Sequence, residues 1–267
     1  MTVLQFPVPA PRNRLLAALP AEDLARLCPQ LEPIDVKLHQ VLHAANEPIT
    51  AVYFPKAGMV SLVSVLTTGG AAEMGIVGSE GMVGVPLLLG GDSSAVEAIC
   101  QGPGPMLRLQ ADLFEQALNE SPALRKLLLR YTLAFQHQVS QTAACNSSHI
   151  LRQRLARWLL IAHDRAVGND FAMTQEFLAQ MLCVYRPSVT TTAGSLQRAG
   201  LIRYSAGRVT VLDRAGLEAA ACECIGTVRH QFKKLIGTAE GSGHHSHGYQ
   251  TLTALVIRPP PQALSPP

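Results

Sequence analysis

The sequence predicts an α+β protein in which two domains are joined by one long helix. The 267 residues exceed what a single hydrophobic core usually organises. Short β-rich runs separated by glycine and proline fill residues 34–109, and a heptad pattern followed by short helical patterns occupies the rest. Hydrophobic residues make up 48% of the chain and charged residues 15%, a composition that excludes wholesale disorder.

Two segments of the sequence indicate where in the cell the protein is located. The longest uncharged run, residues 131–151, contains several glutamines and histidines and is too polar for a bilayer core. The first eleven residues hold three prolines and no cationic segment, unlike a signal peptide. We therefore expect a cytoplasmic protein that makes no contact with a membrane.

The N-terminal region begins with leucines at helical spacing over residues 12–31 and continues with short strands. The clearest β-rich runs cover residues 52–54, 60–66 and 106–109. Glycines at positions 75, 78, 81 and 84 recur every third residue, which does not match a dinucleotide-binding fingerprint. These glycines indicate tight turns in an all-β unit.

A short helix is expected over residues 112–119, and Ser121 with Pro122 then predicts the start of a long helix. Seven residues follow at alternating spacings of four and three, an a/d heptad stripe: Leu124, Leu128, Tyr131, Phe135, Gln138, Thr142 and Cys145. A buried core helix would give the same apolar first half. Because the register persists through the polar half, we favour a seam with a second copy of the chain, formed by Leu124, Leu128, Tyr131 and Phe135.

The C-terminal region predicts a helix-turn-helix. Thr174 caps a helix that runs to about Leu182, and after three residues a second helix begins at Arg186 and ends at Gly200. Two β-rich runs joined by a short turn then predict a hairpin, or wing, and a last helix follows. The residues expected to face inward are Val189, Ala193 and Leu196, and the hairpin and last helix are expected at residues 201–204, 209–212 and 213–225.

Charge is divided unevenly along the chain. Residues 1–150 hold 9 Lys+Arg and 12 Asp+Glu, a net charge of −3, whereas residues 151–237 hold 12 and 6, a net charge of +6. The C-terminal part is thus a small basic unit attached to a mildly acidic larger one. A basic unit of this kind suits a polyanionic partner.

Six cysteines are scattered along the chain, and none forms a CxxC pair. Cys222 and Cys224 are too close for an easy disulfide and short of the usual spacing of zinc ligands. The N-terminal region has no cysteine cluster. We therefore expect free thiols without a metal site or an iron–sulfur cysteine cluster; a redox or iron–sulfur role is the alternative, which the missing N-terminal cluster disfavours.

The chain shows no motif of an enzyme: it lacks HExxH, a P-loop and the G-x-S-x-G nucleophile elbow. We expect no enzymatic activity. Three histidines, His244, His245 and His247, lie in a Gly/Ser-rich segment that precedes a proline-rich end. We predict that residues 238–267 form a solvated, disordered tail rather than a metal site.

The segment from Met173 through Arg186 to Ile202 resembles the winged helix-turn-helix of the Crp/Fnr family of bacterial transcriptional regulators. The β-rich region resembles the β-roll of cyclic-nucleotide-binding domains, and the long helix resembles the helix through which the family dimerises. The resemblance covers about residues 12–230. It implies a β-roll sensor domain at residues 12–120, a dimerisation helix at 121–148 and a winged helix-turn-helix DNA-binding domain at 149–230.

The resemblance implies a homodimeric transcription regulator whose second motif helix lies in the DNA major groove and reads an inverted-repeat operator. Arg186 can then donate two hydrogen bonds to a guanine. Pro187 stands where the family often has glutamate, so a different operator preference is expected. Arg208 is expected to reach the DNA backbone from the wing. The full predicted DNA-binding set is Thr174, Gln175, Arg186, Pro187, Ser188, Thr190, Thr191 and Arg208.

The sensor region departs from the pattern of cyclic-AMP-binding members. Aligning Gly81 and Gly84 with the family's turn puts Met82 where a glutamate takes the ribose, and Ser93-Ser94 where an arginine takes the phosphate. An anionic phosphate needs a paired cation when it leaves water. We therefore expect the effector pocket formed by Gly81, Met82, Gly84, Ser93 and Ser94 to bind something other than cyclic AMP, or to serve only as a scaffold.

The resemblance further implies double-stranded DNA, a second copy of the chain, RNA polymerase and a small-molecule effector as partners. Some family members bind haem, but the spacing of the histidines in this sequence selects no haem ligand, so the cofactor stays open. An alternative of another class is a ligand-binding regulatory module that controls a partner protein without binding DNA. The charge division and the Arg186 turn favour DNA binding.

Overall fold

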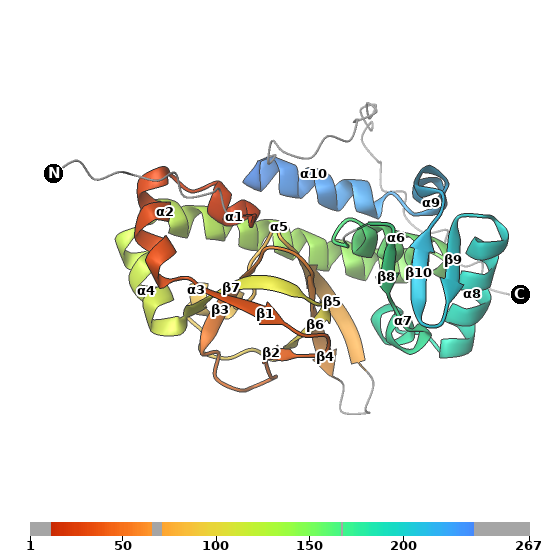
Figure 1. Ribbon diagram of the computed structural model, residues 1–267, viewed down its shortest axis with the longest axis horizontal. Helices are drawn as coiled ribbons and strands as arrows, with labels where there is room; N and C mark the ends of the chain where they lie inside the picture. Colours follow the sequence, from red (N-terminus) through yellow and green to blue (C-terminus); the bar gives the residue numbers. More distant parts are fainter. Residues whose placement is uncertain (1–11, 66–70, 167, 238–267) are drawn as a thin grey trace, which may run out of the picture.

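The computed structural model describes residues 12–65, 71–166 and 168–237 and shows two domains connected by a long helix (Figure 1). The α+β class expected from the sequence is confirmed. The predicted disordered tail, residues 238–267, lies outside the described residues. Within the described ranges, no helix has both the length and the hydropathy needed to cross a membrane.

The N-terminal domain is a β-roll of two antiparallel sheets with strand orders β1-β7-β3 and β2-β6-β4-β5. Valines and alanines from both sheets, together with Met106, fill the space between them. Two short helices and a 3₁₀ turn precede the strands: α1 (Arg14–Ala17), α2 (Ala21–Leu27) and η1 (Cys28–Gln30). The strands are β1 (Glu32–Val36), β2 (Val41–His43), β3 (Ala51–Pro55), β4 (Met59–Val65), β5 (Ala71–Val77), β6 (Glu97–Gly102) and β7 (Gly104–Gln110).

A short helix, α3 (Val85–Leu88), lies between β5 and β6, and α4 (Ala111–Glu120) leads from the last strand of the β-roll to the long helix α5 (Pro122–Ser148). Helix α5 begins where the sequence predicts, because the Ser121 side chain accepts a hydrogen bond from the Leu124 backbone N–H at 3.0 Å. From there α5 runs past the β-roll to the C-terminal domain (Figure 1).

The apolar half of the α5 stripe packs on the β-roll of its own protomer. Leu124, Leu128 and Tyr131 are at most 2% exposed and belong to one core with N-terminal leucines and Phe54. Phe135 is half-buried, and its ring lies directly against Gly75 of β5. The predicted dimer seam of Leu124, Leu128, Tyr131 and Phe135 is therefore wrong, because these side chains are occupied within the monomer.

The polar half of the α5 stripe also faces contacts within the protomer, but these contacts are polar rather than apolar. Gln138 donates a hydrogen bond to the Ile76 carbonyl of β5 at 2.9 Å. One heptad later, Cys145 lies 3.5 Å, Sγ to Sγ, from Cys222 in the C-terminal domain. The stripe is therefore a contact surface along its whole length, first apolar and then polar.

The C-terminal domain is a winged helix-turn-helix built around Trp158, whose ring meets Phe177 edge-on at 5.4 Å. Val189, Ala193 and Leu196 face inward, as predicted. The antiparallel wing sheet has the order β8-β10-β9. The elements are α6 (Leu151–His163), β8 (Asp170–Ala172), α7 (Gln175–Leu182), α8 (Arg186–Arg198), β9 (Ile202–Ser205), β10 (Arg208–Val211), α9 (Arg214–Ala220) and α10 (Cys224–Ile236).

The last helix differs from the prediction of a single helix ending near Ile225. The chain breaks after α9, where Ala221 is extended (ψ 166°), and α10 then folds back along α5 (Figure 1). The Phe232 ring meets Tyr131 edge-on at 6.3 Å, so the C-terminal helix joins the core of the N-terminal domain. The domain boundary predicted at residue 230 falls inside this helix.

Candidate functional site

The outer surface of the helix-turn-helix exposes the first turn of α8. Thr174 caps α7 by accepting a hydrogen bond from the Phe177 backbone N–H at 3.1 Å. Cys183 turns the chain with a left-handed backbone (φ 51°). Helix α8 then begins after Tyr185, and its side chains at positions 186, 187, 188, 190 and 191 are all exposed. The structure therefore brings the predicted reading residues together on one solvent-facing surface.

Arg186 is only loosely held. Its Nε lies 3.9 Å from the Glu176 Oε2, and both side chains are about two-thirds exposed. An exposed pair at this distance contributes little to stability. The guanidinium is therefore free to leave Glu176 for a better acceptor.

The threonines of α8 are held more tightly. Thr190 donates to the Gln175 side chain of α7 at 2.6 Å, which joins the two helices of the motif. The hydroxyl of Thr191 bonds to the Pro187 carbonyl one turn back at 3.1 Å. These side chains support the shape of the surface and leave their methyl groups for apolar contacts.

The wing places Arg208 beside a carboxylate rather than free at its tip. The tip is Ala206-Gly207, both with positive φ, and Arg208 opens β10. Its Nε donates to the Asp170 Oδ2 at 2.7 Å, and its hydrogen bonds lower the pKa of Asp170. Half of the Arg208 side chain remains exposed, so it can still meet a phosphate, but its charge is partly neutralised.

One exposed residue of this surface was missed by the sequence analysis. Tyr185 is 86% exposed and immediately precedes Arg186 at the start of α8. A tyrosine in this position offers both a ring and a hydroxyl to a partner. Its place in the turn directly before the reading helix is the signal that could have identified it.

The predicted effector pocket is not formed as expected. Met82 is fully buried, and its carbonyl accepts a hydrogen bond from the Tyr131 hydroxyl at 3.0 Å. A Cβ at Gly81 would lie 2.5 Å from that hydroxyl, and Gly84 (φ +101°) is pressed against Val52. Ser93 and Ser94 lie in a separate loop that pairs with residues 46–49. The turn at residues 81–84 thus packs against α5 and β3, and of the two expectations this favours a scaffold over a binding pocket.

A cavity of about 390 Å³ lies instead between the β-roll, α6 and α10. Its wall is strongly basic. Glu80 of the β-roll forms an ion pair there with Arg165, which follows α6, and Asp164 pairs with Arg229 of α10. The remaining cations of the wall, Arg14, Arg157 and Lys233, have no carboxylate partner among the described residues.

A buried carboxyl also joins the two domains. Glu73 of β5 accepts hydrogen bonds from Ser61 at 2.7 Å and from the Trp158 indole of α6 at 3.0 Å. Burial raises the pKa of Glu73 to about 7, against the opposing effect of these two hydrogen bonds and of Arg157 and Arg165.

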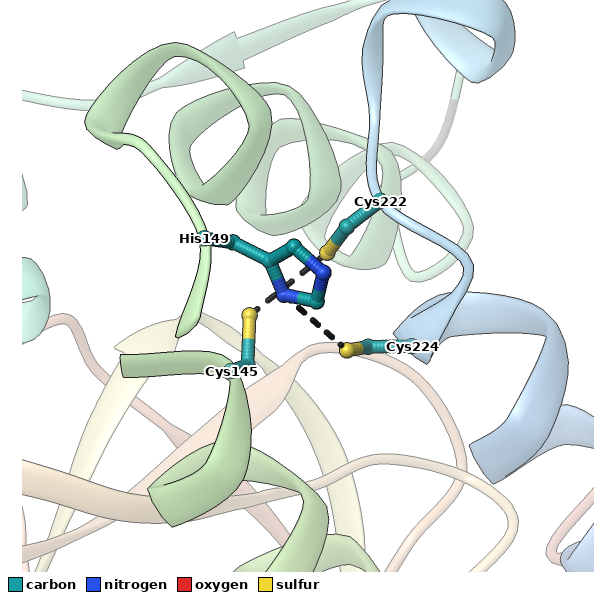
Figure 2. Close-up of side chains that lie close together, drawn as sticks. All are labelled: Cys145, His149, Cys222 and Cys224. Atoms are coloured by element: carbon teal, nitrogen blue, oxygen red, sulfur yellow. Dashed lines mark hydrogen bonds between the residues drawn. The ribbon is translucent and has the colours of Figure 1, made fainter. Parts of the chain in front are cut away.

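The cysteines are not scattered in space. Cys145 near the end of α5, His149 directly after α5, and Cys222 and Cys224 at the α9–α10 turn converge on one point (Figure 2). Their ligand atoms all lie within 4.8 Å of one another. The hydrogen bond with Cys222 lowers the pKa of Cys145 to about 5, and the charge of Arg157 acts in the same direction. All six cysteines are free, as expected, but three of them lie together with His149, which their positions in the sequence did not reveal.

Two pairs of potential metal ligands, far apart in the chain, were the sequence pattern that could have revealed this cluster. Cys145 and His149 are one helical turn apart, and Cys222 and Cys224 are separated by one residue. The two pairs are 77 residues apart in the chain, Cys145 to Cys222, and only the return of α10 along α5 brings them together.

Comparison with known proteins matches both domains. The cyclic nucleotide-binding domain model matches residues 33–121, and the Crp-like helix-turn-helix domain model matches residues 153–220. A global nitrogen regulator from a Nostoc strain is 26% identical over 175 residues, which are 62% of this chain and 78% of that protein.

Solved structures show the same fold. FixK2 from Bradyrhizobium japonicum has a TM-score of 0.62 at 16% identity, covering 72% of this chain and 98% of its own. A CRP-family transcriptional regulator from Thermus thermophilus, TTHB099, has a TM-score of 0.59 at 23% identity, covering 70% of this chain and 96% of its own.

Proposed function

Because this chain belongs to the Crp/Fnr family of transcriptional regulators, we propose that it is a homodimer that binds an inverted-repeat operator through α8. The observation that carries the proposal is the exposed first turn of α8, where Arg186 is only weakly paired with Glu176 on an otherwise well-packed motif. A bidentate arginine–guanine contact is the commonest specific contact in the major groove. RNA polymerase as a further partner and a cytoplasmic location are part of the same proposal.

The dimer face we propose is the exposed side of α5 rather than the buried stripe. Leu129 and Leu133 are 47% and 44% exposed there and lie one helical turn apart. Exposed positions continue along the helix at alternating spacings of three and four residues: 126, 129, 133, 136, 140, 143 and 147. A shallow hollow surrounds the two leucines, lined by Pro122, Arg125, Lys126 and Arg130 as well. A second α5 would cover it, and Crp/Fnr regulators act as dimers.

For the effector, we propose the basic cavity between the domains as the binding site and a small anion as the ligand. Three cations without carboxylate partners would neutralise such a molecule. Binding of cyclic AMP at the turn that contains Gly81 and Gly84 is disfavoured, because Met82 and Tyr131 fill the space there. Ser93, where the family has an arginine, supplies no positive charge for the phosphate. Calorimetry with millimolar cyclic AMP should detect no binding, and a micromolar dissociation constant would contradict this assignment.

A salt titration of binding to duplex DNA tests the main proposal. Contacts to phosphate release counterions, so the logarithm of the binding constant should fall linearly as the logarithm of the salt concentration rises, by about 0.9 per neutralised phosphate. A protein that uses its helix-turn-helix only to contact another protein would show weak binding without a steep slope. That outcome would favour the alternative, a regulatory module that does not bind DNA.

A further inference from the structure

We propose that Cys145, His149, Cys222 and Cys224 bind one Zn²⁺ ion in a tetrahedral Cys₃His site that fastens the start of α10 to the end of α5 (Figure 2). Three thiolates and one imidazole form a common closed set of ligands for a structural zinc ion. Neither of the two domain models that match this chain accounts for these residues as a group, since residues 145, 149, 222 and 224 all lie outside the matched ranges.

The spacing of the ligand atoms fits a single ion. Zinc–sulfur bonds of about 2.3 Å and tetrahedral angles place neighbouring ligand atoms about 3.5–3.8 Å apart. The Sγ atoms of Cys145 and Cys222 are 3.5 Å apart, and the Cys224 Sγ is 3.6 Å from the His149 Nδ1. A cluster of several irons and sulfides would separate ligands on different irons by more than the 4.8 Å seen here.

The surroundings of the ligands are those of a metal site. The His149 Nδ1 faces the sulfurs, while its Nε2 lies 3.3 Å from the Glu223 Oε1. A carboxylate in this position fixes the ring and the tautomer of a zinc-binding histidine. The Gln141 side chain donates to the Cys224 Sγ at 3.1 Å, a hydrogen bond that suits a thiolate ligand.

The positively charged side chains near the cluster also suit the net negative charge that the zinc-bound site would carry. Zinc with three thiolates and a neutral imidazole carries a net charge of −1, and any protons still on the thiols pass to solvent as the ion binds. Two guanidiniums, Arg154 and Arg157, are buried and close enough to act electrostatically on Cys145. The Nε of each has no hydrogen-bond partner among the described residues. A buried anionic site would compensate these charges.

The position of the site suggests what the ion does. Cys145 and His149 span the end of α5, and α6 begins two residues after His149. This junction sets the direction of the DNA-binding domain relative to α5. An ion that ties the α9–α10 turn to the same point would hold that direction, so its removal should loosen the junction.

The test is the metal content of the full-length protein purified under reducing conditions. Elemental analysis should find about one zinc per protomer in the wild type and in Cys28→Ser, a control that changes a cysteine far from the cluster. Cys222→Ser should lose the zinc. Replacement by Co²⁺ should give the visible bands of tetrahedral coordination and a thiolate-to-cobalt charge-transfer band, again absent from Cys222→Ser.

A second variant separates binding from folding. Glu223→Gln leaves all four ligands in place, so it should bind zinc about 10–100-fold more weakly with unchanged circular dichroism. The proposal is overturned if the wild type binds neither Zn²⁺ nor Co²⁺ above the level of Cys222→Ser. An iron–sulfur absorption spectrum, or a mass lower by two hydrogens that reveals a Cys145–Cys222 disulfide, would overturn it as well. None of these readouts depends on DNA binding.

Discussion

Arg186 is the residue on which sequence readout depends in this account. It is exposed, weakly paired and in the first turn of the helix that would enter the major groove. Arg208, by contrast, is already held by Asp170, and in the proposed complex it would contact the DNA backbone. The two arginines should therefore contribute differently, one to specificity and one to general affinity.

Replacing Arg186 with alanine should weaken the best operator by about 1–3 kcal/mol and remove the preference for guanine at one position. Arg208→Ala should weaken binding to all duplexes alike and reduce the salt slope by at most about one unit. Competition between an operator and its single-base variants measures the loss of preference, and direct titration of one duplex at several salt concentrations measures the general weakening and the salt slope. An Arg186→Ala protein with unchanged preference at every position would show that another side chain, such as Tyr185 or Thr190, reads the bases.

Glu73 provides a prediction about pH. Its pKa is about 7 in the folded protein and about 4.5 in an unfolded chain. Between these values the unfolded state releases its proton while the folded state keeps it, so the free energy of unfolding should fall as pH rises. Each unit of pKa difference corresponds to about 1.4 kcal/mol, giving a loss of about 3 kcal/mol that is complete above pH 7.

Glu73→Gln should remove most of this loss, because an amide never ionises. Its oxygen can accept the bond from the Trp158 indole, and its NH₂ group can donate to the Ser61 hydroxyl, which also accepts hydrogen bonds. Urea unfolding at pH 5, 6, 7 and 8 tests this, with the exposed Glu47→Gln as control. A pH profile that is the same in the Glu73→Gln variant and the wild type would rule out Glu73 as the source.

Among the elements, α5 would supply the surface through which the protomers of the proposed dimer meet. Its buried stripe serves the monomer core, which leaves the face with Leu129 and Leu133 for a partner. The heptad spacing was correct evidence that α5 is a contact helix. It could not show which contacts are internal, because that depends on where the β-roll and α10 pack.

Changing Leu129 and Leu133 together to lysine should give a folded monomer, because four charges would face one another across the seam of the dimer. Light scattering reports the mass, and circular dichroism reports the fold. Lysines at the equally exposed Val41 and Leu89 of the β-roll are the control and should leave the mass unchanged. A double variant of α5 that stays dimeric would place the interface elsewhere.

The helix-turn-helix was predictable within about two residues for a physical reason. Its helices are short and joined by a three-residue turn, and the Thr174 side chain caps the first, so the sequence near each position determines its structure. The glycine turn and the cysteine cluster depend on contacts between segments far apart. Met82 meets Tyr131 49 residues later, and Cys145 meets Cys222 77 residues later, so neither contact was visible from local spacing.

For the whole molecule, contacts that couple the domains include Glu73 with Trp158, Glu80 with Arg165, and α10 with α5. The basic cavity lies beside the last two. A ligand or ion that changed these contacts would alter the direction of the helix-turn-helix relative to the dimer face. In the proposed function, an effector would therefore act on DNA binding through the junction between α5 and α6.

The central claim is that two copies of α8 read one operator. Selection of DNA from a random pool by the full-length protein, followed by sequencing, tests it most directly. The account predicts an enriched inverted repeat whose half-sites are about one helical turn, roughly 34 Å, apart, with a guanine in each half that Arg186→Ala no longer selects. A pool without any enriched motif, or with a single unrepeated half-site, would contradict the account.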